Sequence, residues 1–448
     1  MSVGTCQVGV HTPKPPPPVL RRPAVQGDWC EMRDRWGWLR KAWVTLQDVM
    51  VPMVASLQSR SPERVASYHG RSTSLLLVLT VSACGPGDGV PRASTSPDPV
   101  IMLDLFRDGD PRYEFFNVGS VTILSDGRFA IADRGSSEVR FYSRQGRFES
   151  AFGSSGGGPR EFGRLTWIYR IANDSIVAYD LDRSRLTVWT SSGRFARDHG
   201  IQRSSAIPLP IVQDVAFDGS VVVLGRPWAL DRTRPGLQAE TTMVYVDRPP
   251  WDSLIRVGAA TEINFLSRTG RERIPFSAGV VARFREDGSL AVLDGGRRVI
   301  ASNHDGSSTV HSPPADVQLV TPALRERYRS WRLGRVPAGS PDHANLTELF
   351  EAMPFADTIA AFDQLARGAN GEVWLRRYRF FWDYRNHDVN NRWLALDREL
   401  QPVRECTFPG AFDALGFLSD RAVGVWRDSL HIEHPVVVTL DSTICAPT

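Results

Sequence analysis

The chain has 448 residues, of which 42% are hydrophobic and 23% are charged, and its formal net charge is +3. This balance excludes the class of disordered chains that combine low hydrophobicity with high net charge. Because nucleic-acid binding requires basic residues concentrated on one surface, the nearly neutral charge leads us to expect no nucleic-acid partner.

The first 64 residues differ in composition from the rest of the chain. They contain both lysines, Lys14 and Lys41, a run of prolines at 15–18 and a tryptophan-rich stretch at 36–43. They show no repeat related to the remainder of the sequence. We interpret residues 1–64 as a non-native extension upstream of the true start of translation, for which Val65 is one candidate.

Residues 65–84 have the pattern of an export signal. Arg71 precedes the apolar run 75–81, and small residues then lead to Cys84. The run is too short to span a bilayer but has the length of a signal-peptide core. The alternative is that it forms a buried strand of a longer protein.

The sequence Val81-Ser82-Ala83-Cys84 resembles the lipobox of bacterial lipoproteins. The resemblance implies that Cys84 is the lipidated amino terminus of an exported protein. Such a protein belongs to the cell envelope, in the periplasm or on the outer membrane, and contacts the membrane through its lipid alone. Residues 85–99, rich in Gly, Ser and Pro, have the composition of a flexible tether.

Short apolar segments separated by glycine-containing turns recur between residues 100 and 442. The clearest copies align Asp133 with Asp180 and Tyr142 with Trp189. Fainter copies carry Asp-Gly or Asn-Gly turns, which join antiparallel strands. Repeats of about 40 to 50 residues with four short strands bury their apolar faces by packing around an axis. The sequence therefore predicts an all-β fold, a six-bladed β-propeller.

Two segments depart from the simple repeat. The last repeat offers only three strands, and a leftover strand near 100–105 can supply the fourth and remove the exposed edge. We therefore expect an N-terminal strand to close the last blade. Residues 321–361 break the pattern, and Thr321 followed by Pro322 is typical of a helix start. We expect a short helical insertion there, between blades four and five and over one face of the ring.

The first two repeats, with the glycine-rich stretch 156–162 between them, resemble NHL-type six-bladed propellers. More narrowly, the chain resembles the six-bladed propeller lipoproteins of soil bacteria, whose activity is generally unassigned. Arg160 stands where many NHL-type repeats have a glycine. The resemblance implies a propeller fold and supplies no ligand.

Beyond Cys84 the chain contains two cysteines, Cys406 and Cys445. An oxidising compartment allows them to pair, and a disulfide near the end of the repeats would help to close the ring. The alternative is two separately buried thiols.

The stretch 376–385 interleaves cations with aromatic rings, a combination that binds sugars, bases or aromatic ligands by stacking. This stretch is the best candidate for ligand contact, through Arg377, Tyr378, Arg379, Trp382 and Tyr384. We favour the structural interpretation, a strand whose aromatic side chains pack between blades while its arginines are solvated.

Two further patterns are compatible with metal binding, but neither predicts it. The cluster 431–434 contains His431, Glu433 and His434, yet one hairpin does not supply three converging ligands. Asp133, Asp180 and Asp294 recur at the ends of second strands, and this recurrence favours turn capping over a calcium site. We predict no metal site and no cofactor.

The sequence contains no motif of nucleophilic, zinc-dependent or phosphate-binding catalysis, so catalytic residues stay unassigned. Our preferred hypothesis is a monomeric binding or scaffold module for an unknown small ligand or protein. The alternative is a propeller enzyme, a lyase or hydrolase, with a metal such as calcium at the central channel.

The lipid anchor is tested by Cys84→Ala. Without the thiol no acyl chain can be attached at this position, so the protein should move from the membrane fraction to the soluble fraction. Cell fractionation with immunoblotting measures this change, and Ser94→Ala in the tether is the matched control that should stay with membranes. Unchanged membrane retention of the Cys84→Ala protein would remove the lipoprotein hypothesis.

Overall fold

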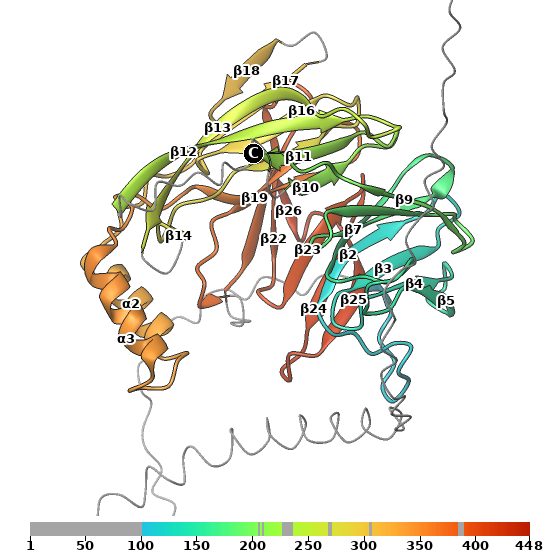
Figure 1. The fold of residues 1–448 in the computed structure, drawn as a ribbon, viewed down its shortest axis with the longest axis horizontal. Helices are drawn as coiled ribbons and strands as arrows, with labels where there is room; N and C mark the ends of the chain where they lie inside the picture. The colour runs from blue at the N-terminus through green and yellow to red at the C-terminus, as the bar shows by residue number, and fades with distance from the viewer. Residues whose placement is uncertain are drawn as a thin grey trace, which may run out of the picture. The chain divides into compact units, whose positions relative to one another are not determined.

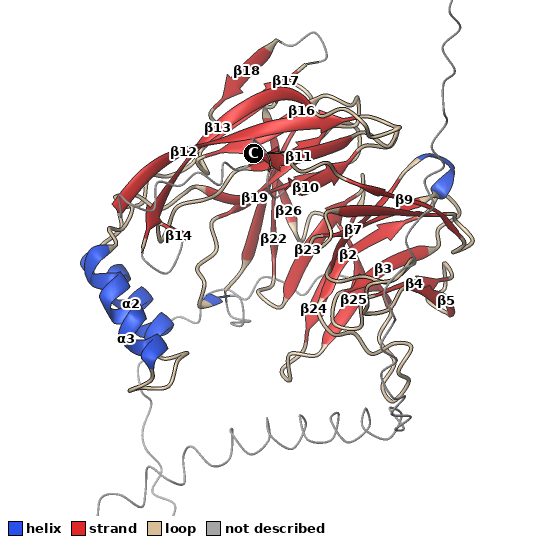
Figure 2. Ribbon diagram, viewed as in Figure 1, coloured by secondary structure: helices blue, strands red, loops and turns tan. Residues whose placement is uncertain are grey.

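The computed structural model describes residues 101–448, except 205–206, 208–209, 226–235, 268–270, 304–306 and 384–388. The segments interpreted as upstream extension, signal peptide and tether lie outside the described residues, and Cys84 with them. Strands dominate the regular structure, and two short α-helices lie between β18 and β19 (Figures 1 and 2).

The first three sheets follow one another along the chain. Blade 1 contains β2 (Val118–Ile123), β3 (Phe129–Asp133), β4 (Glu138–Tyr142) and β5 (Phe148–Phe152). Blade 2 contains β6 (Leu165–Arg170), β7 (Ile176–Asp180), β8 (Arg185–Trp189) and β9 (Phe195–Gly200), with a 3-10 turn at Ala172–Asp174. Blade 3 contains β10 (Pro210–Val215), β11 (Val221–Gly225), β12 (Gly236–Asp247), β13 (Ile255–Leu266) and β14 (Arg271–Arg273).

The other three sheets include both chain ends of the described fold. Blade 4 contains β15 (Val281–Phe284), β16 (Leu290–Asp294), β17 (Arg298–Ser302) and β18 (Ser308–His311). Blade 5 contains β19 (Phe362–Arg367), β20 (Val373–Arg377), β21 (Asn391–Leu396), β22 (Pro402–Phe408) and β26 (Cys445–Pro447). Blade 6 contains β23 (Phe412–Phe417), β24 (Arg421–Arg427), β25 (Glu433–Thr439) and β1 (Ile101–Asp104).

The innermost strands form a closed ring. Going around it, β2 contacts β6, β6 contacts β10, and the contacts continue through β15, β19 and β23 back to β2. All neighbouring strands within the blades are antiparallel. The structure thus confirms the all-β, six-bladed propeller.

Six clusters of the hydrophobic core lie at the interfaces between neighbouring blades, one at each, and a seventh lies at the helical insertion. β3 shows how one strand serves two of them. Ala130 and Ala132 belong to the cluster shared with blade 2, whereas Phe129 and Ile131 belong to the cluster shared with blade 6. Because successive side chains of a strand point to opposite faces, a continuously apolar strand fills both neighbouring interfaces.

The Asp-Gly turns between first and second strands contain the same type of side-chain hydrogen bond in three blades. In blades 1, 3 and 4 the side chains of Asp126, Asp218 and Asp287 accept from the N–H two residues further on, at 3.0, 2.8 and 2.9 Å. The glycine that follows each aspartate has a positive φ, as at Gly127 with φ 86°. This is the local reason for the repeat, since aspartate stabilises the turn and glycine adopts its left-handed backbone without strain.

The ring is closed by the N-terminal strand, as the sequence predicts. β1 pairs antiparallel with β25, which places it at the outer edge of blade 6. A second link joins blade 6 to blade 1, because the carboxylate of Glu433 accepts from the N–H of Val118 at 2.6 Å.

The helical insertion between blades 4 and 5 is also confirmed. α2 (Pro322–Leu333) and α3 (Pro341–Ala352) each begin with proline after a capping residue. The side chains of Thr321 and Ser340 accept from the N–H groups of Leu324 and His343, which satisfies donors at the helix starts. Within the described part of the chain, neither helix has the length and apolar character needed to cross a membrane.

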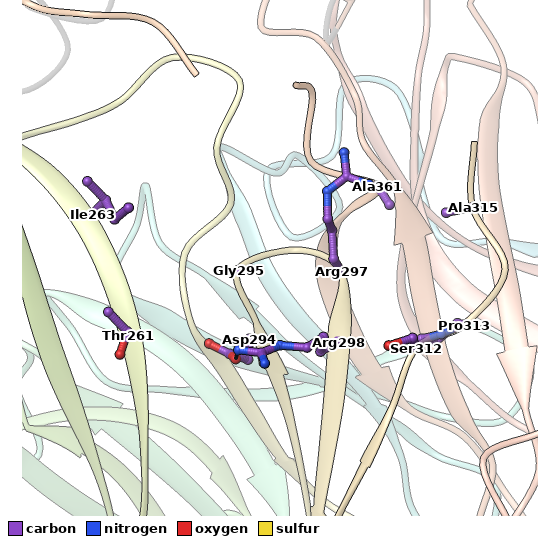
Figure 3. A pocket seen from close by; sticks show the side chains of 10 residues that line it. All are labelled: Thr261, Ile263, Asp294, Gly295, Arg297, Arg298, Ser312, Pro313, Ala315 and Ala361. Atoms are coloured by element: carbon purple, nitrogen blue, oxygen red, sulfur yellow. Dashed lines mark hydrogen bonds and ion pairs between the residues drawn. The ribbon is translucent and has the colours of Figure 1, made fainter. Parts of the chain in front are cut away.

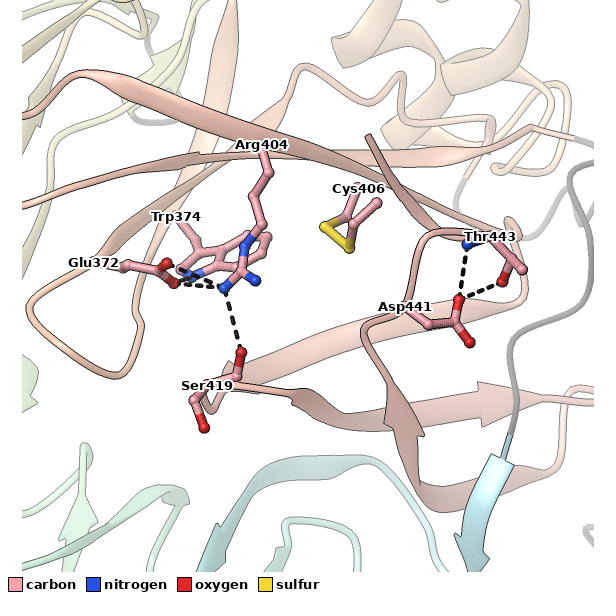
Figure 4. Close-up of a disulfide and its surroundings, with 8 residues drawn as sticks. Glu372, Trp374, Arg404, Cys406, Ser419, Asp441 and Thr443 are labelled. Atoms are coloured by element: carbon pink, nitrogen blue, oxygen red, sulfur yellow. Dashed lines mark hydrogen bonds and ion pairs between the residues drawn. A yellow bond between two sulfur atoms is a disulfide. The ribbon is translucent and has the colours of Figure 1, made fainter. Parts of the chain in front are cut away.

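After blade 6 the chain returns to blade 5, a feature that the repeat does not predict. β26 adds to the outer strand β22, and Cys406 lies opposite Cys445 in this pairing. The two residues form a disulfide with a Cα–Cα distance of 4.0 Å (Figure 4). The propeller therefore extends past residue 442, where the sequence pattern predicts its end. The sequence does not predict β26, because a three-residue strand with one cysteine and one proline carries no alternating apolar pattern.

We predict that the disulfide forms in the purified protein and stabilises it. The two cysteines are 39 residues apart, and the entropy of closing a loop of that size corresponds to roughly 3–4 kcal/mol. The double variant Cys406→Ala/Cys445→Ala should lose about this much stability in urea unfolding compared with the oxidised parent. Mass mapping without reductant should recover the two cysteines in one linked peptide, and free thiols at both would contradict the pairing.

Candidate functional site

The candidate residues lie on one side of the ring. Since neighbouring strands are antiparallel, the connections between second and third strands, and those from one blade to the next, lie where the innermost strands begin. We call this the entry side. The β16–β17 turn, the β20–β21 connection and the segment that carries α2 and α3 belong to it.

Two adjacent cavities on the entry side share Ala315 and Ala361 in their walls. The larger, about 580 Å³, lies between β13, the β16–β17 turn and the segment 312–315 (Figure 3). Its charged groups have protein partners, because Arg298 pairs with Asp294 and Arg297 Nη2 donates to a main-chain carbonyl at 2.7 Å. The Asp294–Arg298 pair therefore needs no ligand, whereas Arg297 has only a main-chain acceptor among the described residues.

The smaller cavity, about 380 Å³, is more polar, and we call it the polar cavity. This volume lies near the lower end of the range for ligand pockets, roughly 300–1,000 Å³. It combines charged, amide and aromatic side chains from three segments of the chain. Its lining consists of residues 314–316, 318, 359–361, 377–380, 383 and 389–392.

Three arginines in the wall of the polar cavity are held by carboxylates. Arg377 Nε lies 3.0 Å from Glu405 Oε1, and Arg392 Nη2 lies 2.9 Å from the same oxygen. Arg379 Nη1 lies 2.7 Å from Asp413 Oδ1. These guanidinium groups are therefore fixed by the protein, and they shape the wall more than they attract an anion.

Asp383 is a buried charged group in the polar cavity that lacks a described hydrogen-bond donor. It is 6% exposed, and its carboxylate accepts no hydrogen bond from the described residues. Burial raises the pKa of this carboxyl, and the charges of Arg327 and Arg379 oppose the rise. A buried carboxylate without donors lowers stability, and such groups are characteristic of binding sites.

Asn391 supplies a second acceptor of the same kind. Its Nδ2 donates to the carbonyl of Phe412 at 3.1 Å, which fixes the orientation of the amide. Its Oδ1 is buried and has no hydrogen-bond partner in the part of the chain that the structure describes. The polar cavity therefore contains two acceptors that lack donors, an arrangement that suits a ligand with hydrogen-bond donors.

Three of the five candidate ligand contacts, Arg377, Tyr378 and Arg379, line the polar cavity. Trp382 stacks on Phe380 at a ring distance of 5.0 Å and packs with the aromatic cluster beneath α2 and α3. Tyr384 lies outside the described residues.

That cluster explains why the stretch is rich in aromatic rings. Phe276, Tyr328 of α2 and Phe350 of α3 form its buried centre, and Phe380 and Trp382 pack against it. Rings of the β20–β21 connection thus hold the helices next to the polar cavity. Asp383 and Asn391, which border that connection, are not recognisable from the cation–aromatic pattern. Asp383 and Asn391 are identified as candidate site residues only by the structure, in which both are buried and no donor is described for the carboxylate of Asp383 or for Oδ1 of Asn391.

Asp133 and Asp180, at the ends of second strands, join the following turn to the segment before the first strand of the same blade. Asp133 Oδ1 accepts from the N–H groups of Phe116 and Gly135, each at 3.1 Å. Asp180 accepts from Gly163 and Arg164 N–H at 2.8 and 3.1 Å. Within the described ranges no three His, Cys, Asp or Glu side chains form a group suited to a metal ion.

The cluster at 431–434 also has structural partners. The Glu433 carboxylate lies 2.9 Å from Arg427 Nη2. His434 lies between the carboxylates of Asp104 and Asp428, at 3.5 and 3.4 Å. This segment stabilises blade 6 and its junction with β1.

No protein-family model matches this chain. A search of curated proteins likewise finds no matching sequence. Solved structures do match. An exported protein of Bacteroides fragilis is 11% identical, with a TM-score of 0.44, over 75% of this chain and 94% of its own.

Two more of the matched structures represent different kinds of protein. A DUF4221 family member from Bacteroides vulgatus is 9% identical, with a TM-score of 0.46, over 78% of this chain and 99% of its own. Virginiamycin B lyase from Staphylococcus aureus is 12% identical, with a TM-score of 0.35, over 72% of this chain and 80% of its own. At these values the comparisons assign neither ligand nor activity to this chain.

We predict opposite effects of removing charge from two buried aspartates. The raised pKa of Asp383 means that its ionised form is disfavoured in the folded state. Stability is therefore lost as the pH rises from the ordinary value of 3.8 through the folded-state pKa. Asp383→Asn should be as stable as the parent or more stable at neutral pH, and any gain should vanish toward acid pH.

Asp133→Asn is the matched control. The pKa of Asp133 is also raised by burial, but its oxygens accept hydrogen bonds from Phe116, Gly135 and Ser136. This variant should lose roughly 1–3 kcal/mol in urea unfolding. A loss of that size in Asp383→Asn instead would show that the carboxylate has a structural role.

Proposed function

We propose that the protein is an exported, lipid-anchored propeller that binds a small hydrogen-bond donor in the polar cavity. The observation that carries this proposal is a pair of acceptors without a described donor in one cavity: the carboxylate of Asp383, a residue that is 6% exposed, and the buried Oδ1 of Asn391. Each acceptor lowers stability when it is left without a donor. Both would be satisfied by a ligand that donates hydrogen bonds.

The chemistry of the cavity narrows the class of ligand. The rings of Tyr378 and Phe380 form part of its wall and offer apolar faces for stacking. The arginines of the wall are already paired with Glu405 and Asp413. Hydroxyl and amino groups on a compact ring therefore match the cavity better than an anion does, and we propose a sugar or amino sugar.

The proposed location rests on the sequence around Cys84 and on the disulfide. The lipobox-like segment motivates a lipid anchor, and the Cys84→Ala variant tests it. A disulfide between Cys406 and Cys445 fits an oxidising compartment, because cytosolic thiols are kept reduced.

The ligand class is tested with three sugars of one scaffold: glucose, glucosamine and glucuronate. Glucose and glucosamine should raise the melting temperature of the purified protein, and glucuronate should not, because its carboxylate would face that of Asp383. A ligand present at a hundred times its Kd adds about 2.7 kcal/mol of stability, which thermal melting resolves.

Asp383→Asn should abolish the shift with glucosamine, and Asp108→Asn, a change at an exposed aspartate, should preserve it. Because Asp383→Asn is expected to fold at least as stably as the parent, lost binding cannot be attributed to unfolding. Binding of glucuronate alone, or glucosamine binding that is unchanged in Asp383→Asn, would contradict the proposed ligand class.

A further inference from the structure

Cationic side chains gather around the innermost strands, away from the polar cavity. Arg283 on β15 and Tyr169 on β6 both donate to the carbonyl of Gln213 on β10, at 2.6 and 2.8 Å. Three neighbouring blades thus meet at one main-chain oxygen. Arg283 and Tyr169 are only partly buried.

The carbonyl of Gln213 is free for these donors because of a β-bulge. The register of β10 with β11 shifts between Val212 and Asp214, so Gln213 is left out of the ladder. Thr166 is the bulge residue of β6, nearer the start of its strand than Gln213 is in β10, and its carbonyl accepts from Arg134 Nε at 2.9 Å. Bulges in the innermost strands thus create acceptors that arginines of neighbouring blades use.

Gly119, the bulge residue of β2, leaves room for this arrangement. A Cβ atom at this position would lie 2.5 Å from Arg134 Nε and 2.6 Å from the carbonyl oxygen of Thr166. The backbone of β2 therefore approaches the arginine more closely than any larger residue allows.

A third arginine reaches across the ring. Arg367, at the end of β19 in blade 5, has its Nη1 3.5 Å from the carbonyl of Val215 in blade 3. Its side chain passes blade 4, whose innermost strand β15 is the shortest of the six. Arg367 therefore points inward, as Arg283 does.

These arginines carry charge that the described protein does not neutralise locally. Arg134, Arg283 and Arg367 form no ion pair within 4 Å of a described carboxylate, and their acceptors among the described residues are main-chain carbonyls. Each guanidinium has five N–H donors, most of which stay available. All three arginines are partly exposed.

The acidic groups nearby are already occupied. The Asp214 carboxylate accepts from the N–H groups of Val215 and Phe284, each at 2.9 Å. Glu433, which acts electrostatically on Arg134, is held by Arg427 and by the N–H of Val118.

The charges that act on the hydroxyl of Tyr169 indicate that the three arginines lie near it. Burial raises the pKa of Tyr169, and the charges of Arg283, Arg367 and Arg134 oppose that rise while Asp214 reinforces it. The three guanidinium groups therefore all lie within electrostatic range of the Tyr169 side chain.

We propose that Arg134, Arg283 and Arg367 bind a small tetrahedral oxyanion at the centre of the ring, of the phosphate or sulfate class. Guanidinium groups match such oxygens in geometry and charge. The site is distinct from the polar cavity, whose arginines are paired with carboxylates. It also makes the centre of the ring unfavourable for a cation such as calcium.

The probe is inorganic phosphate, titrated into the purified full-length chain by calorimetry at low ionic strength. We expect one phosphate bound per chain, and binding weakened by added potassium chloride. Arg283→Gln and Arg367→Gln should each raise the Kd about tenfold or more, as expected for the loss of a charge-assisted contact. Sulfate should compete, and acetate should not.

Arg256→Gln is the matched control, since Arg256 is exposed on β13 and far from the innermost strands in the blade order. It should bind phosphate like the parent. Arg283→Lys and Arg367→Lys keep the charge, so they should fold if the glutamine variants do not, and should bind with intermediate affinity. Absence of phosphate binding to the folded parent would overturn the proposal. So would an equal loss in Arg256→Gln, because it would reflect net charge alone.

Discussion

The structure depends on the burial of each blade between two neighbours. The six apolar clusters sit at the six interfaces, and a central strand such as β3 contributes alternate side chains to two of them. A single blade has no buried face of its own, so its apolar area becomes stabilising only when the ring is complete. The pairing of β1 with β25 completes blade 6, and the Glu433–Val118 contact links that blade to blade 1.

This construction leaves the turns and connections free to carry function. The segments 314–318 and 359–361, which flank the two helices, and the β20–β21 connection lie on the entry side and line the polar cavity with the ends of β20 and β21. Tyr378, Phe380 and Trp382 of that connection pack against the aromatic cluster that holds the helices, and Tyr378 and Phe380 also line the polar cavity together with Asp383. The innermost strands make a second contribution, because their bulges expose carbonyls that orient arginines toward the centre.

The fold was predictable because its causes are local. A few consecutive residues are enough to recognise each of its elements: the Asp-Gly turns, the apolar second strands and the helix start at Thr321-Pro322. The site was only partly predictable. Arg377 and Arg379 stand out in the sequence, but their partners Glu405 and Asp413 lie on other strands. Asp383 and Asn391 are distinguished by their burial in one cavity without a described donor for Asp383 or for Oδ1 of Asn391, a property that depends on the assembled structure.

The return of β26 to blade 5 has a consequence for the integrity of the ring. The disulfide joins Cys406, before blade 6, to Cys445, after it, so that β23, β24 and β25 lie within one covalent loop. Hydrolysis of a single peptide bond in the β23–β24 or β24–β25 turn would give two fragments, and the disulfide would keep them joined. The last blade, which carries the seam with β1, can thus be nicked once by a protease and still keep every strand in place.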